Sequence, residues 1–225
     1  TGVNLAYNNN KILETYTPAD GGQVEIVIGA SSFAIQSKYK VGGSYGDLYG
    51  KDFLYDANGK IVLDSDGRPM FEAKYSKFIG NTTSRFTYGW NNTIRWKDLD
   101  ITLFFRGNVG NDILNVKRWA YAPRSGSQGL NVFMKDVYAL ANGTGVYRQG
   151  KLSDYYLEDG SFLKLDNITV GYTFRFKNND YIQSLRLHAT AENVFTITKY
   201  SGIDPEVNTS DVWNPGIDAT GFYPS

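Results

Sequence analysis

The chain has 225 residues, and its 23 Lys and Arg balance its 23 Asp and Glu, so the formal net charge is zero. This balance gives no electrostatic reason to expect a nucleic-acid partner. The absence of cysteine excludes disulfides and zinc–thiolate sites, and a single histidine excludes a multi-histidine metal centre. We therefore expect no metal and no cofactor. The 17 Tyr, 13 Phe, 4 Trp and 24 Gly favour strands and turns.

The first third of the chain predicts a short alternating strand at 3–7 and a second strand at 45–55. Two hairpin-turn dipeptides follow, Asn58-Gly59 and Asp66-Gly67, and they predict a small β-meander. The acidic residues around these turns also suggest a calcium loop. Their spacing lacks the Glu that an EF-hand needs at its twelfth position, so plain hairpin turns are the preferred interpretation.

The clearest strands are 86–96 and 99–109, which alternate an apolar row with a small or polar row. Only Lys97-Asp98 separates them, so they predict an antiparallel hairpin. The next segment has Ile113, Val116 and Trp119 at helical spacing, which predicts a helix over 111–121. A second helix is expected over 130–140.

Two further long strands are expected at 161–176 and 185–198, joined by a polar turn at 177–184. The apolar row changes phase within the first of them. A β-bulge near Asp166-Asn167 reconciles the two phases.

Strand length indicates the environment. Strands of soluble sandwiches usually have about 5–6 residues, whereas a strand tilted by about 45° needs about 9–11 residues to cross the hydrocarbon layer. The four long runs reach the second length, and several aromatic residues lie near their ends, as in the interfacial girdles of membrane barrels. A large soluble β-sandwich is the alternative. On the membrane interpretation the lipid-facing residues are Phe86, Tyr88, Trp90, Ile94, Trp96, Leu99, Ile101, Leu103, Phe105, Ile168, Val170, Tyr172, Phe174, Leu185 and Leu187.

No motif for catalysis stands out. His188 lies in a polar row and is interpreted as a polar lining side chain rather than a catalytic base. Glu158 and Asp159 are adjacent, so in a strand they point to opposite faces and make a poor glycosidase pair. There is no Walker loop or dinucleotide fingerprint. We therefore expect no enzyme activity.

The unequal connections predict which loops lie outside. Outer-membrane barrels have short periplasmic turns and long external loops. The insertion at 110–157 and the stretch after Tyr200 are therefore expected outside the cell. Their exposed side chains are candidates for stacking on sugar rings or packing on a partner protein, although packing within the loops is the simpler alternative. The candidates are Trp119, Tyr121, Arg124, Trp213 and Tyr223.

Four strings of the sequence match a known family in collinear order. They are Glu158-Asp159-Gly160-Ser161-Phe162-Leu163-Lys164-Leu165-Asp166-Asn167-Ile168-Thr169-Val170-Gly171-Tyr172, the run from Glu192-Asn193-Val194-Phe195 to Val207, Phe86-Thr87-Tyr88-Gly89-Trp90, and Phe105-Arg106-Gly107-Asn108-Val109-Gly110-Asn111-Asp112-Ile113. They resemble the C-terminal region of SusC/RagA-type TonB-dependent transporters.

This resemblance implies a barrel in the bacterial outer membrane of Bacteroidota, with an N-terminal plug, a SusD-like surface lipoprotein as lid and import of oligosaccharides or peptides powered through TonB. Residues 1–225 are then interpreted as a C-terminal barrel segment that lacks the plug, the TonB-contacting region and the closing strand. The fold expected is all-β, with about six strands of a larger antiparallel transmembrane β-barrel and long, partly helical external loops. A soluble β-rich carbohydrate-binding module remains the alternative.

Overall fold

The structure is a computed structural model that describes residues 1–19, 21–22, 24–30, 35–51, 53–65, 70–72, 77–120, 154–177, 181–207 and 216–218. These residues divide into two compact units. The first unit contains Thr1–Asn8, Ser84–Gly110 and Gly160–Lys199, and the second contains the remaining segments. The chain therefore leaves the first unit three times, at 9–83, at 111–159 and after Lys199. We call these segments the first, second and third excursions.

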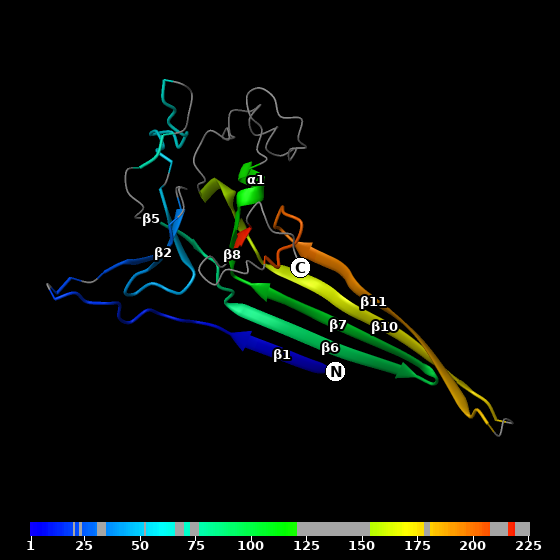
Figure 1. Cartoon of the computed structure of the whole chain (residues 1–225). Coiled ribbons are helices and arrows are strands. Elements are labelled where there is room, and N and C mark those ends of the chain that lie inside the picture. The colour runs from blue at the N-terminus through cyan, green and yellow to red at the C-terminus, as the bar shows by residue number, and fades with distance from the viewer. Residues whose placement is uncertain are drawn as a thin grey trace. The chain divides into compact units, whose positions relative to one another are not determined.

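The first unit is a five-stranded antiparallel sheet in the order β1-β6-β7-β10-β11 (Figure 1). Its strands are β1 (Gly2–Tyr7), β6 (Phe86–Trp96), β7 (Leu99–Val109), β10 (Phe162–Arg175) and β11 (Ser184–Thr198). Within the described residues the sheet is open, with β1 and β11 at its edges. An open sheet was expected from the sequence. The sequence also predicted about six strands in this sheet, and the structure has five.

The β6–β7 hairpin has the register that the sequence predicts. Trp96 pairs with Leu99 and Phe86 with Val109, so Lys97 and Asp98 form a two-residue loop. The long strands have 11 residues in β6 and β7, 14 in β10 and 15 in β11. Because neighbouring strands are antiparallel, all three long excursions leave from the same end of the strands, and both short turns lie at the other end.

A register shift occurs in β10 between Leu165 and Asn167, where a bulge was predicted. Leu165 pairs with Phe105 and Asn167 with Phe104, so Asp166 is an extra residue relative to β7. This extra residue returns Ile168 to the face of Leu165.

The neighbouring strand β11 compensates with an extra residue of its own. Leu165 pairs with Phe195 and Asn167 with Glu192, which leaves two residues of β11 opposite one of β10. Asn193 takes the left-handed conformation there, with φ 52°. Asparagine is one of the few residues other than glycine that adopt this conformation readily.

The second unit contains two smaller sheets. One has the order β2-β3-β4-β5, and the other has the order β12-β8-β9. The bounds are β2 (Ile26–Ala30), β3 (Ile35–Tyr39), β4 (Asp47–Gly50), β5 (Lys77–Asn81), β8 (Asp112–Asn115), β9 (Leu157–Asp159) and β12 (Ile217–Asp218), with the helix α1 (Val116–Ala120) and the 3-10 turn η1 (Asp154–Tyr156). Strand β12 pairs in parallel with β8, and β9 pairs with it antiparallel.

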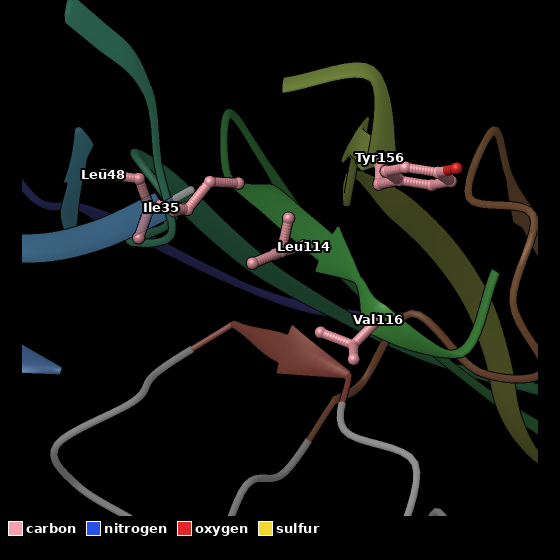
Figure 2. Close-up of a cluster of buried hydrophobic side chains, with 5 residues drawn as sticks. All are labelled: Ile35, Leu48, Leu114, Val116 and Tyr156. Atoms are coloured by element: carbon pink, nitrogen blue, oxygen red, sulfur yellow. The ribbon is translucent and has the colours of Figure 1, made fainter. Parts of the chain in front are cut away.

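The core of the second unit joins segments that are far apart in the sequence. Figure 2 shows Ile35 and Leu48 from the first excursion with Leu114, Val116 and Tyr156 from the second. Ile217 of the third excursion packs against this cluster. The three excursions therefore share one hydrophobic core.

The long strand expected at 45–55 is wrong. Among the described residues of this range only β4 forms a strand, and it belongs to the second unit. Gly46 has φ 83°, and the side chain of Asp47 accepts hydrogen bonds from the Ser44 N–H at 2.7 Å and the Asn81 amide at 2.6 Å. The ladder ends at Gly50, because Phe53 and Tyr55 pair instead with Phe71 and Ile61.

The expected β-meander is present over the part that the structure describes. Gly59 has φ 74°, and Asp56 accepts hydrogen bonds from the backbone N–H groups of Asn58 and Lys60, both at 2.8 Å. This is turn geometry, in agreement with the hairpin interpretation. The turn at Asp66-Gly67 lies outside the described residues.

The helix expected over 111–121 is wrong in its first half. Residues Asp112–Asn115 form β8, because Ile113 and Leu114 are buried between the partner strands β9 and β12. The helix starts only at Val116, after Asn115, whose side chain accepts a hydrogen bond from the Arg118 N–H at 2.7 Å. The helix expected over 130–140 lies outside the described residues.

The bulge at Asn193 can be tested by substitution in the full-length protein. We expect Asn193→Val to lower the free energy of unfolding by about 1–2 kcal/mol, because a β-branched residue in the left-handed region clashes with its own backbone. Asn193→Gly should be tolerated. The matched control is Ala191→Val, two residues earlier in the same strand. Equal losses for the two valine variants in a urea titration would contradict this account of the bulge.

Candidate functional site

The five-stranded sheet has one apolar face. Residues directly opposite each other in an antiparallel ladder lie on the same face. The register therefore groups Val3, Leu5, Tyr7, Phe86, Tyr88, Trp90, Ile94, Trp96, Leu99, Ile101, Leu103, Phe105, Ile168, Val170, Tyr172, Phe174, Leu185 and Leu187, which we call the apolar face. All the residues expected to face lipid are in this group. Asn92, opposite Leu103, is a polar exception on this face.

Aromatic packing stabilises the apolar face laterally. Trp90 stacks on Phe105, its cross-strand partner, with ring centroids 5.4 Å apart. Tyr88 lies over Gly107 and donates its hydroxyl hydrogen to the Phe162 carbonyl at 2.9 Å. A Cβ at Gly107 collides with this tyrosine ring, so the missing side chain makes room for it.

The opposite face is polar. It carries Thr87, Asn91, Thr93, Arg95, Asp100, Thr102, Phe104, Arg106, Asn167, Thr169, Thr173, Arg175, Arg186, His188, Thr190 and Glu192, which we call the polar face. Threonine pairs link neighbouring strands, with 3.3 Å between the hydroxyls of Thr93 and Thr102 and 2.9 Å between those of Thr169 and Thr190. His188 lies on this face, opposite Gly171.

Ion pairs cross the strands of the polar face. Arg186 of β11 reaches Asp100 of β7 across β10, with Nη2 and Oδ2 2.7 Å apart. This ion pair passes over Gly171. A Cβ added to Gly171 would lie 2.5 Å from the Arg186 guanidinium and 2.8 Å from the Asp100 carboxylate, so a larger residue there would clash with the pair. At the bulge, Arg106 pairs with Asp166 at 3.0 Å. Arg106 and Arg186 of this face are therefore each paired with a carboxylate.

A buried polar cluster in the second unit was not found from the sequence. Glu158 accepts hydrogen bonds from the Ser201 N–H and hydroxyl, both at 2.7 Å, and pairs with Arg118 at 3.1 Å. The side chains of Arg118 and Glu158 are only 7% and 9% exposed. The Arg118 guanidinium also lies 4.8 Å from the centre of the Tyr155 ring. This cluster ties the start of the third excursion to the second.

A second buried contact fixes β12. The Tyr200 hydroxyl donates a hydrogen bond to Asp218 at 2.5 Å, and the same carboxylate pairs with Lys117 at 2.8 Å. Burial is the main cause that raises the pKa of the Tyr200 phenol, and the hydrogen bond and negative charge of Asp218 raise it further. The tyrosine is therefore a neutral donor at physiological pH.

No signal in the sequence pointed to these contacts. Glu158 was considered only beside Asp159, as a poor glycosidase pair, and both residues lie in β9. Its partners Arg118 and Ser201 are distant in the chain, and neither belongs to a recognisable motif.

The candidate ligand contacts are not brought together by the described part of the chain. Trp119 lies in α1, but its side chain is not described. Tyr121, Arg124, Trp213 and Tyr223 lie outside the described residues. Among the residues searched, no group of three or more His, Cys, Asp or Glu is arranged to hold a metal ion. No helix in the described ranges is long and apolar enough to span a bilayer.

Comparison with known proteins identifies the family. No family model matches the chain. TonB-dependent receptor P3 of Formosa agariphila is 29% identical over 236 residues, covering 92% of this chain. TonB-dependent receptor SusC of Bacteroides thetaiotaomicron is also 29% identical over 236 residues, covering 97% of this chain. Over almost its whole length the chain is therefore similar to TonB-dependent receptors of the SusC/RagA type. It spans 23% and 22% of the length of these two relatives.

Solved structures give the same assignment of the fold. The closed-closed state of the RagAB peptide importer matches 96% of this chain with a TM-score of 0.66 and 20% identity. The open-open state matches the same share with a TM-score of 0.65 and 19% identity. The segment covers 25% and 24% of those chains, so its open, mostly β architecture corresponds to part of a TonB-dependent receptor.

The Glu158 cluster predicts a local opening when its charge is removed. In the full-length protein, Glu158→Gln should destabilise the contact with residues 201–207 by about 3–5 kcal/mol, because it removes the negative charge that pairs with the buried Arg118 and accepts hydrogen bonds from Ser201. Hydrogen exchange at the Ser201 amide, which donates to Glu158, is the measurement. The matched control is Glu14→Gln, because Glu14 is an exposed carboxylate of the same unit. Unchanged protection of Ser201 contradicts the predicted role.

Proposed function

We propose that this chain forms part of the wall and the outer loops of an outer-membrane active importer that takes up oligosaccharides or peptides. The five strands of its open sheet are strands of a larger transmembrane β-barrel. The apolar face contacts lipid and the polar face lines the aqueous interior. The import is driven through the TonB complex, which contacts other parts of the receptor. The protein is a transporter and catalyses no reaction.

One observation carries this proposal. Side chains separate into an apolar and a polar face across β6, β7, β10 and β11, and each of these strands has at least 11 residues. Strands of about 9–11 residues cross the hydrocarbon layer when tilted. Lipid-facing and lumen-facing residues alternate along such strands.

The exposure of the apolar face favours a membrane over water. Trp90 is 40% exposed, Ile94 49% and Leu187 57%. In a soluble carbohydrate-binding module, a second layer buries these side chains, because a contiguous apolar surface of this extent is unfavourable in water. In a bilayer the same surface contacts hydrocarbon, and its exposure needs no protein partner.

The names of the related proteins support the substrate and partner classes. SusC is named as a TonB-dependent receptor, and RagAB is named as a peptide importer. By analogy, we assign this receptor an oligosaccharide or peptide ligand and a SusD-like surface lipoprotein as lid. The insertion at 110–157 is assigned to the outer surface, where Trp119, Tyr121 and Arg124 contribute to the ligand or lid contact together with Trp213 and Tyr223.

The facing assignment is tested by a pair of neighbouring substitutions in the complete receptor. Leu103 lies on the apolar face and Thr102 on the polar face. If Leu103 lies near the bilayer midplane, we expect Leu103→Arg to lower the free energy of unfolding by about 2–4 kcal/mol, because the charge enters hydrocarbon. Thr102→Arg should cost much less, because its side chain reaches water. Unfolding titrations in lipid vesicles measure both, and equal losses contradict the proposal.

The external position of the insertion is tested on intact cells. An epitope tag placed near Ser127 should bind antibody without permeabilisation, since this segment is assigned to the outer surface. Antibody binding only after permeabilisation contradicts this orientation.

The contact role is tested separately by Trp119→Ala and Trp213→Ala. Each substitution should weaken ligand or lid-protein binding to the complete receptor, because aromatic contacts of this kind provide much of the binding energy. Unchanged affinity for both partners contradicts the assigned contacts.

A further inference from the structure

Aromatic side chains gather at the short-turn end of the five-stranded sheet. Trp96 is the last residue of β6, and Leu99, the first residue of β7, pairs with both Trp96 and Tyr172. The rings of Tyr172 and Phe174 pack edge to face with centroids 4.8 Å apart. All three aromatic residues belong to the apolar face. We call Trp96, Lys97, Tyr172 and Phe174 the turn-end cluster.

Lys97 has an unusual backbone for a lysine. It is the first residue of the two-residue loop between β6 and β7, and its φ is 54°. Hairpin loops of this length favour glycine or asparagine at a position with positive φ, because other side chains crowd the backbone there. A residue held in such a conformation suggests a functional role for its side chain.

The charge of Lys97 is directed to the aromatic surface rather than to an acid. Its Nζ lies 5.0 Å from the centre of the Trp96 ring. The adjacent Asp98 is engaged by Arg175, with Nε and Oδ1 2.7 Å apart. Within the described ranges, no carboxylate forms an ion pair with Lys97. The loop therefore presents a cation beside the indole at the edge of the apolar face.

We propose that the turn-end cluster binds the headgroup of anionic phospholipids, such as phosphatidylglycerol, in the periplasmic leaflet. This inference rests on the proposed function, because it needs the apolar face to contact lipid and the short turns to be periplasmic. The ammonium of Lys97 binds the phosphate as a point charge, and Trp96 lies at the boundary between headgroups and hydrocarbon. Tyr172 and Phe174 contact the upper part of the acyl chains.

The arrangement fits a phospholipid better than a sugar. Sugar rings bind proteins by stacking on an open aromatic face, whereas Lys97 lies over the ring of Trp96. An anionic headgroup instead gains from the cation and leaves the indole in place. The neighbouring rings on the same face provide the apolar contact that an inorganic anion does not need.

The experiment uses the complete receptor in nanodiscs of phosphatidylcholine and phosphatidylglycerol. Native mass spectrometry then counts the phosphatidylglycerol molecules that each variant retains. Lys97→Gln and Lys97→Gly remove the cation, and the glycine also relieves the backbone conformation. Lys97→Arg keeps the charge. The matched control is Lys60→Gln, because Lys60 is exposed in the β-meander of the second unit.

We expect Lys97→Gln and Lys97→Gly to lower phosphatidylglycerol affinity about fivefold, the factor for one basic residue near an anionic surface. Lys97→Arg and Lys60→Gln should retain the wild-type amount, and excess inorganic phosphate should not displace the lipid. Lys97→Gly should also be at least as stable as the wild type in detergent, so loss of lipid cannot reflect misfolding.

If Lys97→Gly retains as much phosphatidylglycerol as the wild type, the headgroup site is contradicted, but the proposed import function is not. Displacement by inorganic phosphate also overturns it, because the site then binds any phosphate. If the receptor does not enter the bilayer at all, the importer proposal fails first. Bilayer insertion of every variant therefore distinguishes failure of this inference from failure of the proposed function.

Discussion

Backbone pairing along the long antiparallel ladders is the constraint on which the rest of this structure depends. In hydrocarbon every peptide group needs a partner within the protein, because no water is present to replace it. The ladders of β6, β7, β10 and β11 provide these partners over 11 to 15 residues per strand. They also fix the register, and the register decides which side chains share a face.

The paired bulges show how strictly this constraint applies. Asp166 adds one residue to β10 relative to β7, and Asn193 lies where β11 has one residue more than β10. Without the extra residue in β11, the side chains before and after this point of β11 would alternate out of phase with those of β10, so one part of β11 would have its apolar row on the wrong side of the sheet. The left-handed Asn193 therefore keeps Phe195, which pairs with Leu165 opposite Phe105, on the same side of the sheet as Leu187. Asp166 forms an ion pair with Arg106.

The sequence predicts the features that local alternation determines. The β6–β7 hairpin, its two-residue loop and the bulge at Asp166 follow from period-2 patterns and turn chemistry. The patterns fail in the second unit, where tertiary contacts decide the structure. Ile113, Val116 and Trp119 have helical spacing, but Asp112–Asn115 form a strand between β9 and β12. The Glu158 cluster joins segments that no local rule connects. Most of the ligand-contact candidates lie beyond the described residues.

The central claim is that the apolar face contacts lipid and the polar face contacts water. Spin labels placed one at a time along β7, in the complete receptor in bilayers, measure this most directly. Apolar oxygen should relax labels at Leu99, Ile101, Leu103 and Phe105, whereas a water-soluble nickel complex should relax labels at Asp100, Thr102 and Arg106. This account predicts an alternation with period 2 along the strand. Uniformly low accessibility to both reagents at the apolar positions would contradict it, because it would place that face in a protein core.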